Sequence, residues 1–168
     1  METVVSALII IGILILVVFG AAYYLLNAQA AISDSSRVMQ ARLNDRARTG
    51  LTTVSATTNV SGDYVQVILQ NTGTTKQADL KNWDVILQYT DINAAPQIYW
   101  YLYATQWNAQ IYQSISPPQL EVIEPGILNP GEYLVLQINT TPVVGTGTTN
   151  LAVVTTPNGV TVQAVFTH

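Results

Sequence analysis

Residues 4–26 are a stretch of 23 residues without a charged side chain, and this stretch lies at the start of the chain. Only Ser6, Gly12 and Gly20 interrupt a series of Val, Leu, Ile, Ala, Phe and Tyr. A helix of this length, which rises about 1.5 Å per residue, spans the roughly 30 Å hydrocarbon core of a bilayer. The stretch therefore predicts a helix whose surroundings are apolar, whether lipid or protein.

The helix is expected to continue well beyond the apolar stretch. No Gly lies between Gly20 and Gly50, and residues 21–48 are rich in Ala, Leu, Gln and Arg, which are good helix formers. Arg46 and Arg48 fall in the last turn, where cations suit the helix dipole, and Gly50 suits the C′ position. We predict one helix to about residue 48, roughly 70 Å long, with an apolar first half and an amphipathic second half.

The rest of the chain has the pattern of short β-strands separated by turns. Val65, Val67 and Leu69 alternate with polar residues, as in a strand with one buried face. The expected strands are residues 63–71, 83–90, 97–104, 110–115, 132–138, 150–155 and 160–166. The last two are expected to form a closing hairpin. Seven or eight short strands with regular turns are typical of an immunoglobulin-like β-sandwich.

The predicted fold class is therefore α+β, with a long hydrophobic helix followed by an all-β sandwich head. The helical segment is expected to cover residues 1–50 and the head residues 51–168. Residues 52–58 are expected to link the helix to the head, and residues 142–149 to form a flexible loop.

The charge distribution argues against a nucleic-acid-binding protein. The formal net charge is −4, and only 10% of the residues are charged. Residues 1–48 carry a slight excess of Arg, whereas the head is acidic. A nucleic-acid-binding surface would need a clustered cationic face. The low charge, the absence of Cys and the 20 Thr residues suit an extracellular protein better than a cytosolic enzyme.

The residues needed for catalysis or metal binding are missing or badly placed. The single histidine, His168, is the last residue, which argues against a catalytic triad. Glu121 and Glu124 are the closest pair of carboxylates, but their spacing places them on opposite sides of an extended chain. We therefore expect no enzyme, no metal site, no cofactor and no small-molecule substrate.

Two other features point to the surface of the head. Six aromatic residues fall within 14 positions. Core packing would explain those on one face of the strand that carries them. The alternative is that the aromatic residues form a contact surface toward another subunit or a ligand. These residues are Tyr99, Trp100, Tyr101, Tyr103, Trp107 and Tyr112. Asn59 and Asn139 each begin a glycosylation sequon, although two sequons are no more than chance predicts for this composition.

An ordinary membrane anchor is the simplest alternative for the apolar helix. The nearest cations, Arg37 to Arg48, follow the apolar stretch, and the positive-inside rule would then place the head in the cytoplasm. A Thr-rich head without Cys is unexpected there. A short basic leader that preceded Met1 and was cleaved would remove the conflict.

The order of these segments resembles that of archaellins and archaeal type IV pilins. The resemblance lies in the apolar helix and in three stretches of the head, residues 65–87, 129–138 and 153–166. It extends to the β-sandwich accessory proteins of the archaellum. Bacterial type IV pilins carry Glu at the fifth mature position, where this chain has Val5, so the archaellins are the better match.

The resemblance implies a structural subunit that polymerises into an extracellular filament for motility. The chain would first reside in the membrane, and a separate ATPase and membrane platform would drive its assembly into a homopolymer. The helix would then lie in the filament core, through Val4, Val5, Leu8, Ile11, Gly12, Ile15, Val18, Phe19, Gly20 and Leu25. An adhesive pilin, or a membrane-anchored accessory protein whose head binds the cell envelope, remains an alternative.

Overall fold

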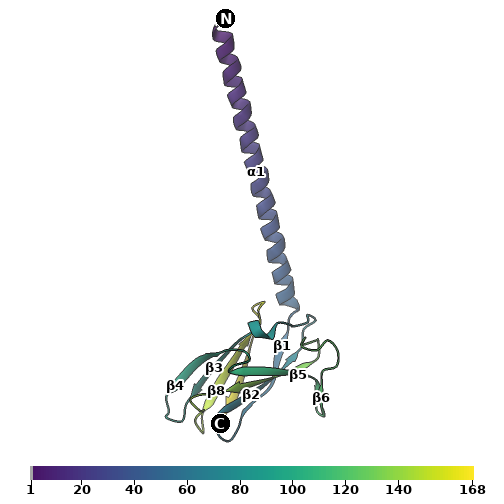
Figure 1. Ribbon diagram of the computed structural model, residues 1–168, viewed down its shortest axis with the longest axis vertical. Helices are drawn as coiled ribbons and strands as arrows, with labels where there is room; N and C mark the ends of the chain where they lie inside the picture. The colour runs from purple at the N-terminus through teal and green to yellow at the C-terminus, as the bar shows by residue number, and fades with distance from the viewer. Residues whose placement is uncertain (1) are drawn as a thin grey trace. The chain divides into compact units, whose positions relative to one another are not determined.

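The computed structural model describes residues 2–168, and the side chains of residues 5–168. The chain divides into two compact units, of which the first ends at Leu43 and the second is Asn44–His168. Helix α1 (Glu2–Arg48) contains most of the first unit (Figure 1). The head contains strands β1 (Leu51–Thr58), β2 (Tyr64–Asn71), β3 (Asp84–Thr90), β4 (Pro96–Tyr101), β5 (Trp107–Ile115), β6 (Pro118–Leu120), β7 (Tyr133–Asn139), β8 (Thr149–Thr155) and β9 (Thr161–Thr167), and the 3-10 helix η1 (Leu80–Asn82).

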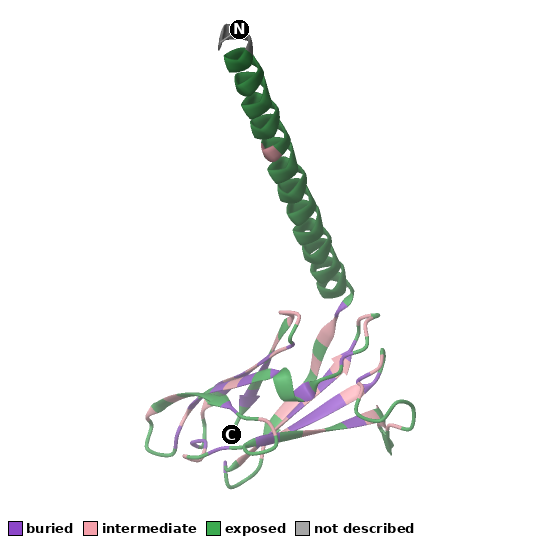
Figure 2. Ribbon diagram, turned by 45° about the horizontal axis from the view of Figure 1, so that its top comes forward, coloured by how far each residue is buried: buried purple, intermediate pink, exposed green. Residues whose placement is uncertain are grey.

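Helix α1 ends at Arg48, as the sequence predicts. Of its described side chains, those from Val5 to Arg48 are exposed, apart from the position of Gly20 (Figure 2). No Pro interrupts residues 2–48, and the Ala, Leu, Gln and Arg of residues 21–48 favour a helix through their local propensity.

The head is formed by two antiparallel sheets, so the α+β prediction is confirmed. One sheet has the strand order β1-β2-β7-β5-β6, and the other has the order β4-β3-β8-β9. In the first sheet Val67 lies opposite Leu136, and in the second Thr155 lies opposite Thr161 across the predicted β8–β9 hairpin. The β2–β7 pair thus joins strands that are distant in sequence, whereas the β8–β9 pair is a local hairpin.

The hydrophobic core lies between the two sheets and comes entirely from the head. The alternation predicted for β2 holds, because Val65, Val67 and Leu69 are fully buried. Two tryptophans, Trp83 and Trp107, are its largest side chains. The other fully buried members include Val85, Leu87, Leu128, Leu134, Leu136, Ile138 and Ala152. The head therefore has a core of its own, independent of the helix.

The prediction of a linker at residues 52–58 is wrong, because these residues form strand β1. Leu51 lies opposite Asn71 and Thr58 lies opposite Val65, with an irregularity in the register between Thr53 and Ser55. The polar, Thr-rich segment has no strong apolar alternation, so its pairing depends on the free edge of β2. Leu51 and Ala56 pack against the core, and the backbone pairing with β2 positions the Thr residues between them.

The junction between helix and head departs from the expected glycine cap. Gly50 does not have the positive φ of a left-handed C′ cap, which is the role that the sequence predicts for it. Instead its carbonyl accepts hydrogen bonds from the amides of Thr72 and Gly73, at 2.9 and 3.1 Å. A Cβ atom on Gly73 would lie 2.3 Å from the Gly50 nitrogen and 2.5 Å from the Arg48 carbonyl oxygen. The two glycines therefore allow two backbone segments to cross closely.

A threonine closes the helix at this junction. The Thr49 hydroxyl donates to the Asp45 carbonyl at 2.8 Å. It accepts hydrogen bonds from the Gln77 side chain at 3.1 Å and from the Asn158 side chain at 2.7 Å. One donor and two acceptor positions of the hydroxyl are thus all used. We call Arg48–Gly50, with the residues bonded to them, the neck.

Candidate functional site: helix and head surfaces

The apolar surface of α1 is the most extensive candidate site. Among the residues predicted for a filament core, Val5, Leu8, Ile11, Ile15, Val18, Phe19 and Leu25 have exposed side chains. The side chain of Val4 lies outside the described residues. A shallow groove of about 220 Å³ runs between Ile11, Leu14, Ile15, Val18 and Phe19 and is lined by apolar atoms alone.

The two helix glycines leave gaps in this surface. A Cβ atom at Gly12 or Gly20 would meet no heavy atom within 4 Å. A neighbouring helix could approach the backbone at these positions more closely than elsewhere. By its length and composition alone, the helix could also cross a membrane.

The six predicted aromatic residues do not form one surface. Tyr101 and Trp107 are buried in the core of the head, so their assignment to a contact surface is wrong. The Trp107 indole donates to the Tyr101 carbonyl at 3.0 Å, and the Tyr103 ring lies 4.8 Å from that of Trp107. Tyr103 and Tyr112 are partly buried. Burial also raises the pKa of the Tyr101 phenol well above its ordinary value.

Two members of this aromatic set remain exposed, both on β4. Tyr99 leans on Tyr101, with ring centroids 6.4 Å apart. Trp100 projects from the other side of the strand and donates its indole N–H to the Asp84 carboxylate at 2.9 Å. The aromatic concentration in the sequence therefore mixes core with surface. Only the tertiary structure separates them, because it decides which face of β4 and of β5 lies against the other sheet.

Both sequon asparagines are exposed and lie at one end of the head. Asn59 follows β1 and donates its side-chain amide to Asp63 at 2.6 Å. The amide of Thr140, which follows Asn139, donates to the Asp63 carbonyl at 2.9 Å. This end is opposite the neck, because β1 begins at the neck and ends just before Asn59. Glycosylation at either asparagine stays a prediction.

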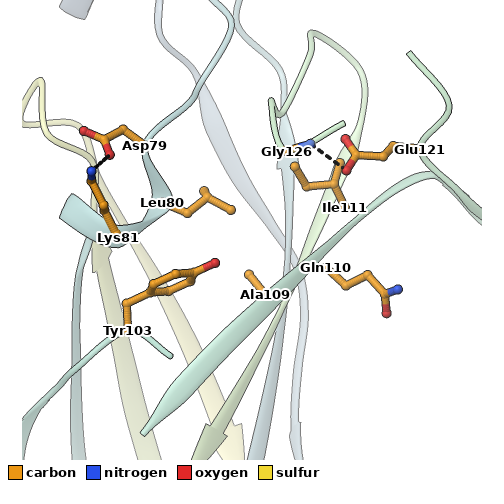
Figure 3. Close-up of a pocket in the computed structure, with 9 residues that line it drawn as sticks. All are labelled: Asp79, Leu80, Lys81, Tyr103, Ala109, Gln110, Ile111, Glu121 and Gly126. Carbon is orange, nitrogen blue, oxygen red and sulfur yellow. Dashed lines mark hydrogen bonds and ion pairs between the residues drawn. The ribbon is translucent and has the colours of Figure 1, made fainter. Parts of the chain in front are cut away.

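A shallow pocket lies between η1, β5 and residues 121–126 (Figure 3). Its volume is about 390 Å³, and the Tyr103 hydroxyl points toward its centre. One oxygen of Glu121 accepts a hydrogen bond from the Gly126 amide at 2.9 Å, and the other is buried without a partner among the described residues. Asp79 is on the opposite side of the pocket, and its Oδ1 atom lies 3.6 Å from the Nζ atom of Lys81.

This pocket does not bring together the groups of a catalytic site. Its two carboxylates lie at opposite sides of the pocket, that of Asp79 beside Lys81 and that of Glu121 beside the Gly126 amide, and neither is hydrogen-bonded to a nucleophile or a histidine among the described residues. In the part of the chain that the structure describes, no three residues of the His, Cys, Asp and Glu types lie together.

Asp91 is a buried carboxylate that has a structural role. It accepts hydrogen bonds from the amides of Ala95 and Asn93, at 2.9 and 2.8 Å, and from the Gln97 side chain at 2.8 Å. The hydrogen bond from Ala95, supported by those from Gln97 and Asn93, lowers the pKa of Asp91 below its ordinary value, against the opposing effect of burial. These bonds shape the turn between β3 and β4.

Comparison with solved structures places the fold among archaellum proteins. The archaeal flagellum of Methanospirillum hungatei strain JF1 is similar over 97% of this chain and 92% of that chain, with a TM-score of 0.64 and 16% identity. The FlaF–FlaG periplasmic stator complex from Sulfolobus acidocaldarius covers 69% of this chain and 87% of its own, with a TM-score of 0.51 and 23% identity. FlaG from the same organism covers 70% and 99%, with a TM-score of 0.50 and 24% identity. No curated protein sequence matches the chain.

The uncovered apolar helix and the two-sheet head define a class of protein, the subunits of filaments built around N-terminal helices. A sequence profile of archaeal-type flagellin matches residues 2–166. The chain therefore belongs to the archaeal-type flagellin family, as its resemblance to the archaellins predicts. This family consists of structural subunits, and the chain is a filament subunit for motility. Archaellin filaments are extracellular homopolymers, and the apolar helix is compatible with insertion into a membrane before assembly.

Proposed function

We propose that the chain polymerises through α1, whose apolar surface passes from the membrane into the core of the filament. The observation that supports this most strongly is the exposure of the apolar side chains along Val5–Leu26. Residues 4–26 contain 15 large aliphatic or Phe side chains. The described ones are 50–74% exposed, so covering the remainder contributes about 1–1.5 kcal/mol each, or roughly 20 kcal/mol in all relative to water. The helix therefore needs an apolar environment at every stage.

The transfer between the two environments explains how a filament can grow from a membrane store. Lipid and a bundle of identical helices are both apolar, so the free energy of the helix differs little between them. Packing then favours the filament where small residues allow close approach, and Gly12 and Gly20 supply such positions. A separate ATPase and a membrane platform would supply the work of extraction. The chain itself would need no catalytic activity, cofactor or small-molecule substrate.

The proposal is tested by mass spectrometry of filaments sheared from cells that produce the chain. We expect this chain to be the main component of the sheared fraction, and N-terminal sequencing of that band to identify its first residue. A strain that lacks the gene is the matched control, and it should lose both the filaments and swimming. Recovery of the chain in the membrane fraction alone would refute polymerisation.

The same experiment tests a membrane-anchored accessory protein, which the family assignment disfavours. The observation in its favour is the likeness of fold, over 69% and 70% of this chain, to a chain of the FlaF–FlaG stator complex and to FlaG. In that case the head would bind the cell envelope, and filaments would persist in sheared fractions without this chain. An adhesive pilin would instead give filaments that contain the chain, and its deletion would abolish attachment to surfaces but leave swimming intact.

A further inference from the structure

Two neighbouring rows on the outer face of the four-stranded sheet are largely apolar, while most other outward positions of its strands are Thr. Strand pairing aligns Ile98 of β4, Gln88 of β3, Leu151 of β8 and Val165 of β9 in one row across the sheet. Ile98 is 70% exposed and Val165 is 63% exposed. An open groove of about 440 Å³ runs along this row. We call the groove lined by these four residues the outer groove.

The next row across the same face is also largely apolar. It aligns Trp100, Ile86, Val153 and Gln163. Asp84 is the only charged residue in the sequences of the four strands. Strands that are buried on both faces have continuous apolar runs, such as Val85–Leu87 and Leu151–Val154, in place of alternation. These runs indicate that the outer face is covered in the assembled protein.

The other sheet lacks this property on its outer face. There one row aligns Gln66, Gln137 and Asn108. The next row contains Ile68 and Val135, but Ile68 is half-buried and Val135 is buried, whereas Ile98 and Val165 of the four-stranded sheet are exposed. The two outer faces therefore differ in how much apolar surface they expose.

A second group of exposed apolar side chains lies on the segment after β6. Leu120, Val122 and Ile123 project from the head, and Val122 is 77% exposed. Two bonds hold this segment in place: Lys76 forms an ion pair with Glu124, and the Asn129 side chain donates to the Ile123 carbonyl at 3.2 Å. We call Leu120–Ile123 the apolar loop.

The outer groove and the apolar loop lie at opposite ends of the head. The apolar loop adjoins Lys76, next to Gln77, which bonds to Thr49 in the neck. The outer groove lies where β3 ends and β8 begins, which is the end away from the neck. Figure 1 labels β4 and β6 on opposite sides of the head. A single head therefore presents two apolar surfaces that cannot cover each other.

We propose that the outer groove of one head receives the apolar loop of the next copy of the chain, so that heads contact head-to-tail along the filament. This inference rests on the proposed polymerisation. An open helical polymer needs a heterologous contact, in which two different surfaces of one chain are complementary. The outer groove and the apolar loop satisfy that requirement, because they are different surfaces of one head and each exposes large apolar side chains, Ile98 and Val165 in the groove and Val122 and Ile123 in the loop. An isologous contact between two outer grooves would instead close into a dimer.

Cysteine crosslinking tests the contact, because the chain has no cysteine of its own. Variants that carry Ile98→Cys, Val122→Cys, or both are produced in cells, and their sheared filaments are treated with a short bismaleimide. We expect the double variant to give a ladder of covalent oligomers, at least tenfold above the level in either single variant. Val60→Cys, at a side chain that is 96% exposed at the end of the head away from the neck, replaces Val122→Cys in the matched control.

Each outcome of this experiment either supports or overturns the contact. Covalent dimers from Ile98→Cys alone would show that outer grooves face each other, and would overturn the heterologous arrangement. Filaments without any ladder in the double variant would overturn it as well, while the proposed polymerisation would stand. The failure of that function would be recognised separately, because the unmodified chain would then form no filaments.

A charge substitution provides a second measurement that does not depend on crosslinking geometry. Val122→Asp should reduce the yield of sheared filaments at least tenfold, because it places a carboxylate in an apolar groove. Val60→Asp should leave the yield unchanged, which controls for the added charge. Equal yields from both variants would contradict the proposed contact.

Discussion

Replacing Ile11 with Lys places one positive charge in the middle of the apolar stretch. Ile11 is 53% exposed in the isolated chain, so about half of its side chain remains to be covered on assembly. Covering that half contributes about 1 kcal/mol, and a Lys at the centre of an apolar span costs about 3 kcal/mol. Transfer of the helix from water into an apolar core should therefore weaken by about 4 kcal/mol per subunit, or about a thousandfold in its equilibrium constant, and addition from the membrane is weakened by the part of this cost that lipid does not share.

The cost should fall more on the filament than on the membrane store. In lipid a Lys side chain can extend toward the headgroups. In a core of identical helices the same charge recurs on every neighbour, so the charges repel one another. We therefore expect Ile11→Lys to accumulate in the membrane fraction while filaments disappear.

The assay compares the amount of chain in sheared filaments with that in membranes by quantitative mass spectrometry. Ile11→Ala should reduce filament yield only about fivefold to tenfold, since it loses about 1 kcal/mol of burial. Gln29→Lys adds the same charge to an exposed position beyond the apolar stretch and should leave the yield unchanged. Near-ultraviolet circular dichroism of each full-length variant, purified in detergent, checks that the head folds. Filaments of normal yield and length from Ile11→Lys would refute a helix-lined core.

Three further predictions concern the stability of the head, measured by urea unfolding of residues 44–168. Gly73→Ala should destabilise the head by roughly 3 kcal/mol, because the new methyl group would clash with the backbone of Gly50. The control Thr74→Ala retains the backbone hydrogen bonds of the neck and should cost less than about 1 kcal/mol. Leu136→Ala should cost about 2–5 kcal/mol, because Leu136 is fully buried between the sheets, and a smaller loss would indicate a loosely packed core. Asp91 has a lowered pKa in the folded state, so its stabilising contribution is present above the ordinary value of 3.8 and is lost as the pH falls through the folded pKa. The free energy of unfolding should therefore become smaller as the pH is lowered through that range. This loss should be smaller in Asp91→Asn.

Local patterns were sufficient to predict several parts of this fold. Strand β2 was predicted because Val65, Val67 and Leu69 alternate with polar residues, and the structure buries all three. The β8–β9 hairpin was predicted from the turn at residues 156–159. Strand β1 was missed, because its Thr-rich sequence pairs with β2 through backbone groups and carries little apolar pattern.

The candidate surfaces of the head were less predictable. The sequence places Tyr99, Trp100, Tyr101 and Trp107 close together, but it does not show that Tyr101 and Trp107 enter the core while Trp100 faces outward. Whether each of these rings points to the core or to solvent depends on where β4 ends and β5 begins, and on which sheet each strand joins. The apolar run in β3 did contain a signal for the outer groove, since a strand without alternation is covered on both faces.

The sequence by itself determined the helix and the need for an apolar environment around it. Helical hydrogen bonds join residues four apart, so composition and length suffice to predict α1 as far as Arg48. The tertiary structure alone decided the pairing of the strands, the close crossing of Gly50 and Gly73, and the placement of the outer groove and the apolar loop at opposite ends of the head. These features join residues far apart in the chain, and such contacts follow from the packing of the two sheets as a whole.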